Sequence, residues 1–167
     1  MSAIGNRTGR FIVRFTCAFI LLFAAAVFLN AEEGCLKNAW SAFGKKDYKS
    51  AIGYSDSCIK KFGKIALDQQ AKLEKDSVPL PPAGNVDNEA EKNQIFSRGL
   101  INDVATAYWI KGQCAEFLYQ NSKDKKYKTM AEQSYKGASE LKYGRCWDPK
   151  GWFWSPCDAV KKRLPIQ

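Results

Sequence analysis

The sequence of 167 residues contains no histidine. This absence removes the usual general base and the commonest metal ligand, and with them every histidine-based catalytic triad. A phosphate-binding glycine loop, a dinucleotide-binding fingerprint and a zinc-type spacing of cysteines are missing too. We therefore expect no catalytic residues, no metal site and no cofactor. The protein should be a binding protein and not an enzyme.

Acidic residues are comparatively few, with 17 Asp and Glu against 26 Lys and Arg, which gives a net charge of +9. Residues 1–31 hold three arginines and no acid, so residues 32–167 carry +6. Their lysines are scattered among acidic residues and form no dense basic stripe with aromatics between them. Nucleic-acid binding is therefore not expected.

One long hydrophobic run is present, FTCAFILLFAAAVFL at 15–29, and it follows a positively charged stretch. This is the layout of a secretory signal peptide over 1–31, since a membrane span needs roughly 20 apolar residues. Ala31 suits a cleavage site, but the large Leu29 does not, so an uncleaved inner-membrane anchor through 11–31 is the alternative. Either way, we expect residues 32–167 to form one domain in an exported, oxidising compartment, either periplasmic or secreted.

Apolar residues recur at helical spacing through 31–63, with an interruption at 44–47 and Asp47 as a candidate N-cap. This pattern predicts an antiparallel helical hairpin. With the turn between Lys46 and Asp47, Ala42 should lie opposite Ala51, Ala39 opposite Tyr54, and Cys35 opposite Cys58. The last pair suits a disulfide, with two buried free thiols as the alternative.

The hairpin at 35–63 resembles a degenerate tetratricopeptide repeat. Ala39, Tyr48, Ala51 and Cys58 occupy family-like positions, whereas Lys46 stands where the family has glycine and Ser55 where it has an aromatic residue. A second such unit at about 105–141 is carried by Gly112, Ala115, Ala131, Tyr135 and Ala138. The resemblance implies an all-α fold of antiparallel helical hairpins that binds a protein partner.

Between these units, 65–75 should continue as a helix with Leu67 and Ala71 on one side and Ile65 as a further candidate for that side. Three prolines and a glycine then break the pattern, which predicts a loop over 76–88. This loop is either a connector or a proline-rich docking ligand.

Residues 89–121 have a broad apolar face that includes Phe96 and Phe117, and they read as one long helix. Gly99 and Gly112 lie inside it, and each should mark a close helix contact or a break. A polar turn at 122–128 and a further helix at 127–142 follow.

The segment 144–167 should begin with Gly144 as a helix C-cap, continue as a turn, and end in a short helix from Ser155 to about Arg163. It carries Trp147, Trp152 and Trp154. Its first interpretation is an aromatic cap over the exposed end of the helical stack. The alternative is a stacking platform for a sugar ring or a peptide aromatic.

Five cysteines follow the first 31 residues, so one of them has no partner within the expected domain. We expect Cys146 to pair with Cys157 and Cys114 to be a buried free thiol, with Cys114–Cys157 as the rival pairing.

Together these features predict an exported interaction module of the cell envelope, a scaffold or adaptor that binds a peptide or protein segment. The expected binding residues on its helix faces are Tyr54, Tyr108 and Tyr119. The alternative function is carbohydrate or cell-wall binding through the three tryptophans of the C-terminal segment.

Overall fold

The structure is a computed structural model that describes residues 36–166. This part of the chain is mostly helical with one two-stranded hairpin, so the expected all-α class is confirmed. The expected signal or anchor segment and Cys35 lie outside the described residues. The elements in chain order are a helix at 36–44, α2 (Tyr48–Lys75), α3 (Glu89–Phe96), α4 (Gly99–Ser122), α5 (Lys125–Glu140), β1 (Cys146–Asp148), β2 (Trp152–Trp154) and α6 (Pro156–Lys161).

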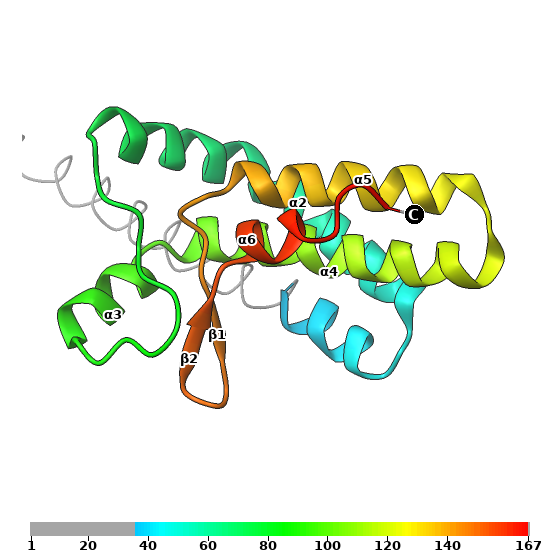
Figure 1. Cartoon of the computed structure of the whole chain (residues 1–167), viewed down its shortest axis with the longest axis horizontal. Helices are drawn as coiled ribbons and strands as arrows, with labels where there is room; N and C mark the ends of the chain where they lie inside the picture. The colour runs from blue at the N-terminus through cyan, green and yellow to red at the C-terminus, as the bar shows by residue number, and fades with distance from the viewer. Residues whose placement is uncertain (1–35, 167) are drawn as a thin grey trace, which may run out of the picture.

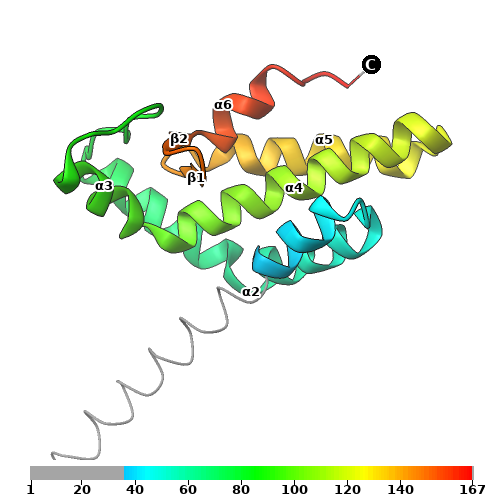
Figure 2. The same ribbon diagram turned by 90° about the horizontal axis from the view of Figure 1, so that it is seen from below.

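The central element is α4. Helix α2 packs along one side of it and α5 along the other, and both run antiparallel to α4 (Figure 1). Helix α6 lies on α5 and α4, on the side away from the helix at 36–44 (Figure 2). Two main core clusters follow α4 along its length, one around Ile110 and Cys114 and the other around Ile101 and Val104. None of the helices described is both long and apolar enough to cross a membrane.

The first helical hairpin turns where the sequence predicts it. Lys46 adopts a left-handed backbone with φ of 61°, and the backbone N–H of Asp47 donates to the carbonyl of Ala42 at 2.9 Å. The Asp47 carboxylate accepts the backbone N–H of Ser50 and begins α2, so the expected N-cap is confirmed. Ala42 and Ala51 are both buried, as the predicted close crossing requires.

Helix α2 runs unbroken for 28 residues, but the apolar side expected for its second half is not the buried one. Ile65 and Leu67 are 41% and 40% exposed, and the buried positions are Ala66 and Gln70 instead. The Gln70 side chain donates to the carbonyl of Glu140 and accepts the backbone N–H of Tyr143. A polar residue is therefore buried here because it links the C-terminal ends of α2 and α5.

The long helix expected at 89–121 is two helices, α3 and α4, separated at Ser97 and Arg98. The Asn102 side chain donates to the carbonyl of Ile95 at 2.8 Å, which satisfies an acceptor at the end of α3. Gly99 therefore stands at a break, one of the two roles expected of it.

Gly112 has the other expected role, a close helix contact. A Cβ atom at this position would lie 2.3 Å from the ring of Tyr135 on α5. The same arrangement recurs in reverse, because a Cβ at Gly137 would lie 2.6 Å from the ring of Tyr108 on α4. The turn between the two helices is shorter than expected, with Lys123 left-handed at φ of 58° and Asp124 capping α5.

The C-terminal segment differs from the expected turn between two helices. It forms a β-hairpin in which Cys146 pairs with Trp154 and Trp147 with Phe153. Gly84, from the loop after α2, exchanges two backbone hydrogen bonds with Phe153 and extends the hairpin. Gly144 is not a helix C-cap; Leu141 has that position.

Helix α6 begins as expected, with the Ser155 hydroxyl accepting the backbone N–H of Asp158 and Pro156 in the first turn. It ends at Lys161, before the expected Arg163. Val160 and Ile166 bury themselves against α4 and α5. The tail thus covers the helices with the buried aliphatic side chains of Val160 and Ile166, and of its three tryptophans Trp154 packs against a ring of α4, that of Trp109.

The cysteines follow the expectation in part. Cys114 is a buried free thiol, as predicted, but Cys146 and Cys157 are free as well, so both pairings considered for Cys157 are wrong. The Cys157 thiol points at the carbonyl of Ser139 instead, with Sγ 3.2 Å from the oxygen. Cys58 is disulfide-bonded; the partner predicted for it, Cys35, lies outside the described residues.

Candidate functional site

A groove lies between the first helical hairpin, α4 and the C-terminal segment of the described chain. It consists of two adjoining hollows of about 400 and 700 Å³, which share Glu116, Gln120 and Arg163. Aromatic side chains line it from separate parts of the chain. We call it the aromatic groove and define it by Phe43, Tyr48, Trp109, Glu116, Phe117, Gln120 and Arg163.

The aromatic rings of the groove form a row in which each ring contacts the next. The ring centroids of Tyr48 and Phe117 are 4.3 Å apart. The ring centroid of Phe43 lies 6.5 Å from that of Tyr48 and 5.8 Å from that of Trp109. Trp109 in turn packs edge-on against Trp154 at 4.9 Å. Phe117 is 43% exposed, so the row combines a packed side with a side that faces the solvent.

Local helix geometry explains this assembly. On α4, positions 109, 113, 116, 117 and 120 fall on one face, because residues three and four apart are neighbours on a helix surface. Trp40 and Phe43 share a face of the first helix for the same reason. Asp47 then starts α2 so that Tyr48, its first residue, points at Phe117.

A polar cluster lies at the base of the groove. The Glu116 carboxylate accepts from the hydroxyl of Tyr135 and, at 3.0 Å, from the guanidinium of Arg163. Gln113 donates to the Tyr135 hydroxyl at 2.6 Å. Burial, followed by the hydrogen bond to Glu116, raises the pKa of Tyr135. The phenol therefore stays protonated and donates to Glu116, which holds the carboxylate in place below Arg163.

This arrangement is suited to binding. The carboxylate of Glu116 and the guanidinium of Arg163 are bonded to each other within the groove. Within residues 36–166, no group of three or more His, Cys, Asp or Glu could hold a metal ion. What the groove offers is apolar ring surface beside a fixed pair of opposite charges.

The three tyrosines expected to form one binding face lie in different surroundings. Tyr54 is 42% exposed and lines a separate hollow with Asn38. Tyr108 is half-buried against Gly137. Tyr119 is half-buried between Lys123 and Lys128, whose ammonium groups both lie 5.8 Å from its ring centre. Tyr108 and Tyr119 are also about 16 Å apart along α4, at about 1.5 Å per residue.

The tryptophans of the tail separate into two environments. Trp154 is half-buried against Trp109, at the edge of the aromatic groove. Trp147 is 43% exposed and lies 6.2 Å from the ring of Phe96, which is 53% exposed. Both rings rest on buried Phe153, at 4.8 and 5.3 Å. We call these two exposed rings the Trp147–Phe96 patch; Trp152, half-buried at the start of β2, is not part of it.

Sequence reasoning missed most of the groove. It placed Phe117 on the inner face of its helix and gave Glu116 and Arg163 no role. The spacing of Trp109, Glu116 and Phe117 along one helix face was a usable signal. Nothing local, however, indicated that Arg163 returns to meet Glu116 from 47 residues away.

No protein-family model matches the chain, and no curated protein or solved structure matches it either.

Proposed function

We propose that the protein is an exported helical interaction module that binds a peptide or protein segment in the aromatic groove. The observation that carries the proposal is the row of partly exposed rings beside the Glu116–Arg163 ion pair. A partner can bury the apolar surface of such rings at little cost in side-chain entropy. Tyrosine, tryptophan and arginine are also the residues that contribute most of the binding energy in protein interfaces. In the cell envelope the module would act as a scaffold or adaptor. Residues 11–31 would tether it if they are retained.

A tetratricopeptide-like organisation is part of this proposal. The helix at 36–44 with α2, and α4 with α5, are antiparallel neighbours with small residues at their crossings. Modules of this kind bind extended segments along their helix faces. The length of α2 and the presence of α3 between the two pairs depart from a strict repeat.

The groove also suggests the chemistry of its partner. Its two hollows, of about 400 and 700 Å³, are in the size range of roughly 300–1,000 Å³ that is usual for ligand sites. Lys46 and Lys162 are exposed at its rim. A segment with one or two aromatic or large aliphatic side chains, flanked by acidic residues, would complement both properties.

Site-specific photo-crosslinking tests the proposal. A benzophenone amino acid at position 117 should form adducts with a discrete partner in cells that produce the protein. Position 65 is the matched control, because Ile65 is also apolar, on a helix and 41% exposed, but lies on α2 outside the groove. Arg163→Ala should reduce the adduct at 117. Equal crosslinking at both positions, or none at 117, would contradict the proposal.

The Trp147–Phe96 patch favours a second candidate function, carbohydrate or cell-wall binding. Two adjacent exposed rings supported by a buried third are a suitable surface for stacking a sugar. Soluble glucan oligosaccharides and peptidoglycan fragments should then change the tryptophan fluorescence in a saturable manner, and Trp147→Ala should abolish the change. An unchanged response in Trp147→Ala would exclude this patch as the site.

A further inference from the structure

Arg98 is a buried cation whose guanidinium is not fully paired. The residue is 7% exposed. It lies in the turn between α3 and α4 and is the N-cap residue of α4. Its Cζ lies 5.3 Å from the ring centre of Tyr143, and its Nη1 atom is buried without a hydrogen-bond partner. A buried charge normally needs hydrogen bonds or a counterion, because leaving water is costly.

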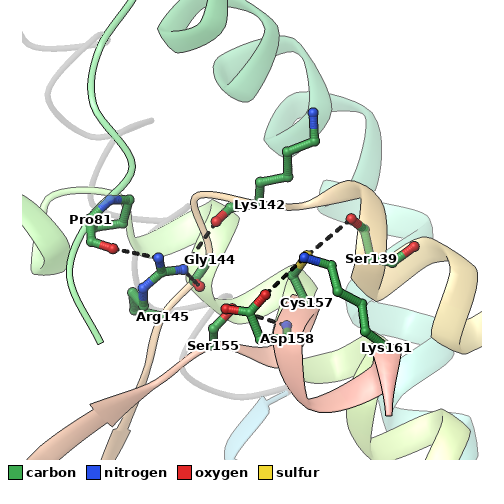
Figure 3. A network of polar contacts seen from close by, with 9 residues as sticks. All are labelled: Pro81, Ser139, Lys142, Gly144, Arg145, Ser155, Cys157, Asp158 and Lys161. Atoms are coloured by element: carbon green, nitrogen blue, oxygen red, sulfur yellow. Dashed lines mark hydrogen bonds and ion pairs between the residues drawn. The ribbon is translucent and has the colours of Figure 1, made fainter. Parts of the chain in front are cut away.

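A second buried arginine nearby shows how the same fold satisfies such a group. Arg145 is 6% exposed, and its guanidinium donates to the backbone carbonyls of Pro81, Lys142 and Gly144 (Figure 3). It also donates to the carbonyl of Pro82. Burial lowers the pKa of both arginines, and the charge of Arg98 lowers that of Arg145 further. The two guanidinium groups are thus close enough to interact, and the carboxylate of Asp158 acts on Arg145 as well. Each guanidinium nitrogen of Arg145 donates at least one hydrogen bond, whereas Nη1 of Arg98 has no partner.

Arg98 lines a cavity of about 380 Å³ between the C-terminal end of α2 and the N-terminal end of α4. Gln69, Lys72 and Asp76 line it from α2 and its C-cap, and Gln94 and Ser97 line it from α3 and its C-cap. No side chain caps the first turn of α4, so backbone N–H groups of this turn also lack a side-chain acceptor. The charged residues that line the cavity are Lys72, Arg98 and Asp76, so its lining carries one net positive charge.

From these observations we propose that this cavity binds a carboxylate, with Arg98 as its main ligand and the first turn of α4 as a second donor. A guanidinium presents two parallel N–H groups that match the two oxygens of a carboxylate, and a helix N-terminus favours the same charge. The single net positive charge fits a monoanion better than a phosphate dianion. The Gln94 side-chain amide supplies a further neutral donor.

NMR titration of the ¹⁵N-labelled full chain tests the proposal, with sodium acetate as the probe and sodium chloride to hold the ionic strength constant. Acetate should shift the Arg98 side-chain signal and the backbone signals of 99–101 in a saturable manner. Arg98→Met should weaken this binding about tenfold or more, since it removes a charge-assisted hydrogen bond. Lys64→Gln is the control, because it removes an exposed positive charge elsewhere on α2.

A second variant keeps the test decisive if Arg98→Met does not fold. Gln94→Glu places a carboxylate within the cavity, so it should raise the melting temperature and abolish saturable acetate binding. Inorganic phosphate should bind more weakly than acetate to the wild type. Non-saturable shifts, shifts that persist in Arg98→Met, or wild-type acetate binding by Gln94→Glu would each overturn the proposal.

Two arms identify the source of the carboxylate. A tetraalanine peptide with a free C-terminus that binds more tightly than acetate, while its amidated form does not bind, would indicate a peptide terminus. Equal binding by acetate and the free peptide, with none by the amidated peptide, would indicate a small free acid. Equal binding of both peptide forms would show that the carboxylate is not recognised, and would overturn the proposal.

Discussion

Replacing Gly112 with alanine should destabilise the protein, because Tyr135 occupies the space that a Cβ atom would need. The added carbon would lie 2.3 Å from Cε1 and 2.4 Å from Cδ1 of the ring, whereas carbon atoms pack at about 3.5–4.0 Å. The ring has little freedom to move away. Tyr135 is completely buried, and its hydroxyl is bonded to both Glu116 and Gln113.

The expected size of the effect follows from two opposing terms. Overpacking a core costs about 1–3 kcal/mol, and an overlap this severe belongs at about 3 kcal/mol. Alanine recovers about 1 kcal/mol through its better helix propensity, which leaves a net loss of about 2 kcal/mol. Gly53 on α2 is exposed and has no atom within 4 Å of its would-be Cβ. Gly53→Ala should therefore gain about 1 kcal/mol.

Urea denaturation followed by circular dichroism compares the two variants directly. Their free energies of unfolding should differ by about 3 kcal/mol, or about 6–12 °C in melting temperature for a domain of this size. In a Tyr135→Leu background the cost of Gly112→Ala should fall by more than about 1 kcal/mol, because the clashing ring is gone. The reasoning is refuted if Gly112→Ala is as stable as the wild type, or if its cost is the same in both backgrounds.

Three further predictions follow from burial. Burial raises the pKa of the Cys114 thiol from 9.0 to about 12, so the native state keeps a proton that the unfolded chain loses. Its contribution to the free energy of unfolding should therefore fall by about 1.4 kcal/mol per pH unit between about pH 9 and 12. Urea titrations at about pH 8 and 10 should show a shallower loss in Cys114→Ala, and equal slopes would contradict this. By the same assay, Phe153→Ala should lower the free energy of unfolding by about 3–5 kcal/mol, because Phe153 is 1% exposed. Trp147→Ala should lower it by about 1 kcal/mol or less, because Trp147 is 43% exposed. Equal losses in the two variants would contradict this orientation of the hairpin. In the native protein, maleimide should modify half-buried Cys146 before buried Cys114 and Cys157, as peptide mass spectrometry would report, whereas earlier modification of Cys114 would be inconsistent with this core.

The first hairpin and α5 were predictable because their signals are local. Asp47 caps its own helix, and the three repeat-like positions of α5, which are Ala131, Tyr135 and Ala138, repeat at helical spacing and are buried. Gly112 was correctly marked as a candidate for a close contact. The glycine itself could not indicate which side chain would fill the space, because Tyr135 comes from another helix.

The failures share a different cause, since each depends on a contact distant in sequence. Gln70 is buried because the end of α5 supplies its hydrogen-bond partners, and Leu67 is exposed because none of the elements described in 36–166 covers that side of α2. The tail forms strands where Gly84 provides a third backbone edge for Phe153. A count of cysteines suggested a Cys146–Cys157 bridge, but the fold uses Cys157 to contact Ser139 on α5.

The sequence by itself determined the all-α class, the turn at Lys46–Asp47, the capping of α6 by Ser155 and the burial of Cys114, since periodicity and capping act over a few residues. The tertiary structure alone decided the aromatic groove and the cavity at Arg98. The groove exists because Arg163 meets Glu116 across 47 residues. The cavity exists because α2, α3 and α4 end close together and leave Nη1 of a buried guanidinium without a partner. Both are products of packing between distant segments, which composition and spacing do not encode.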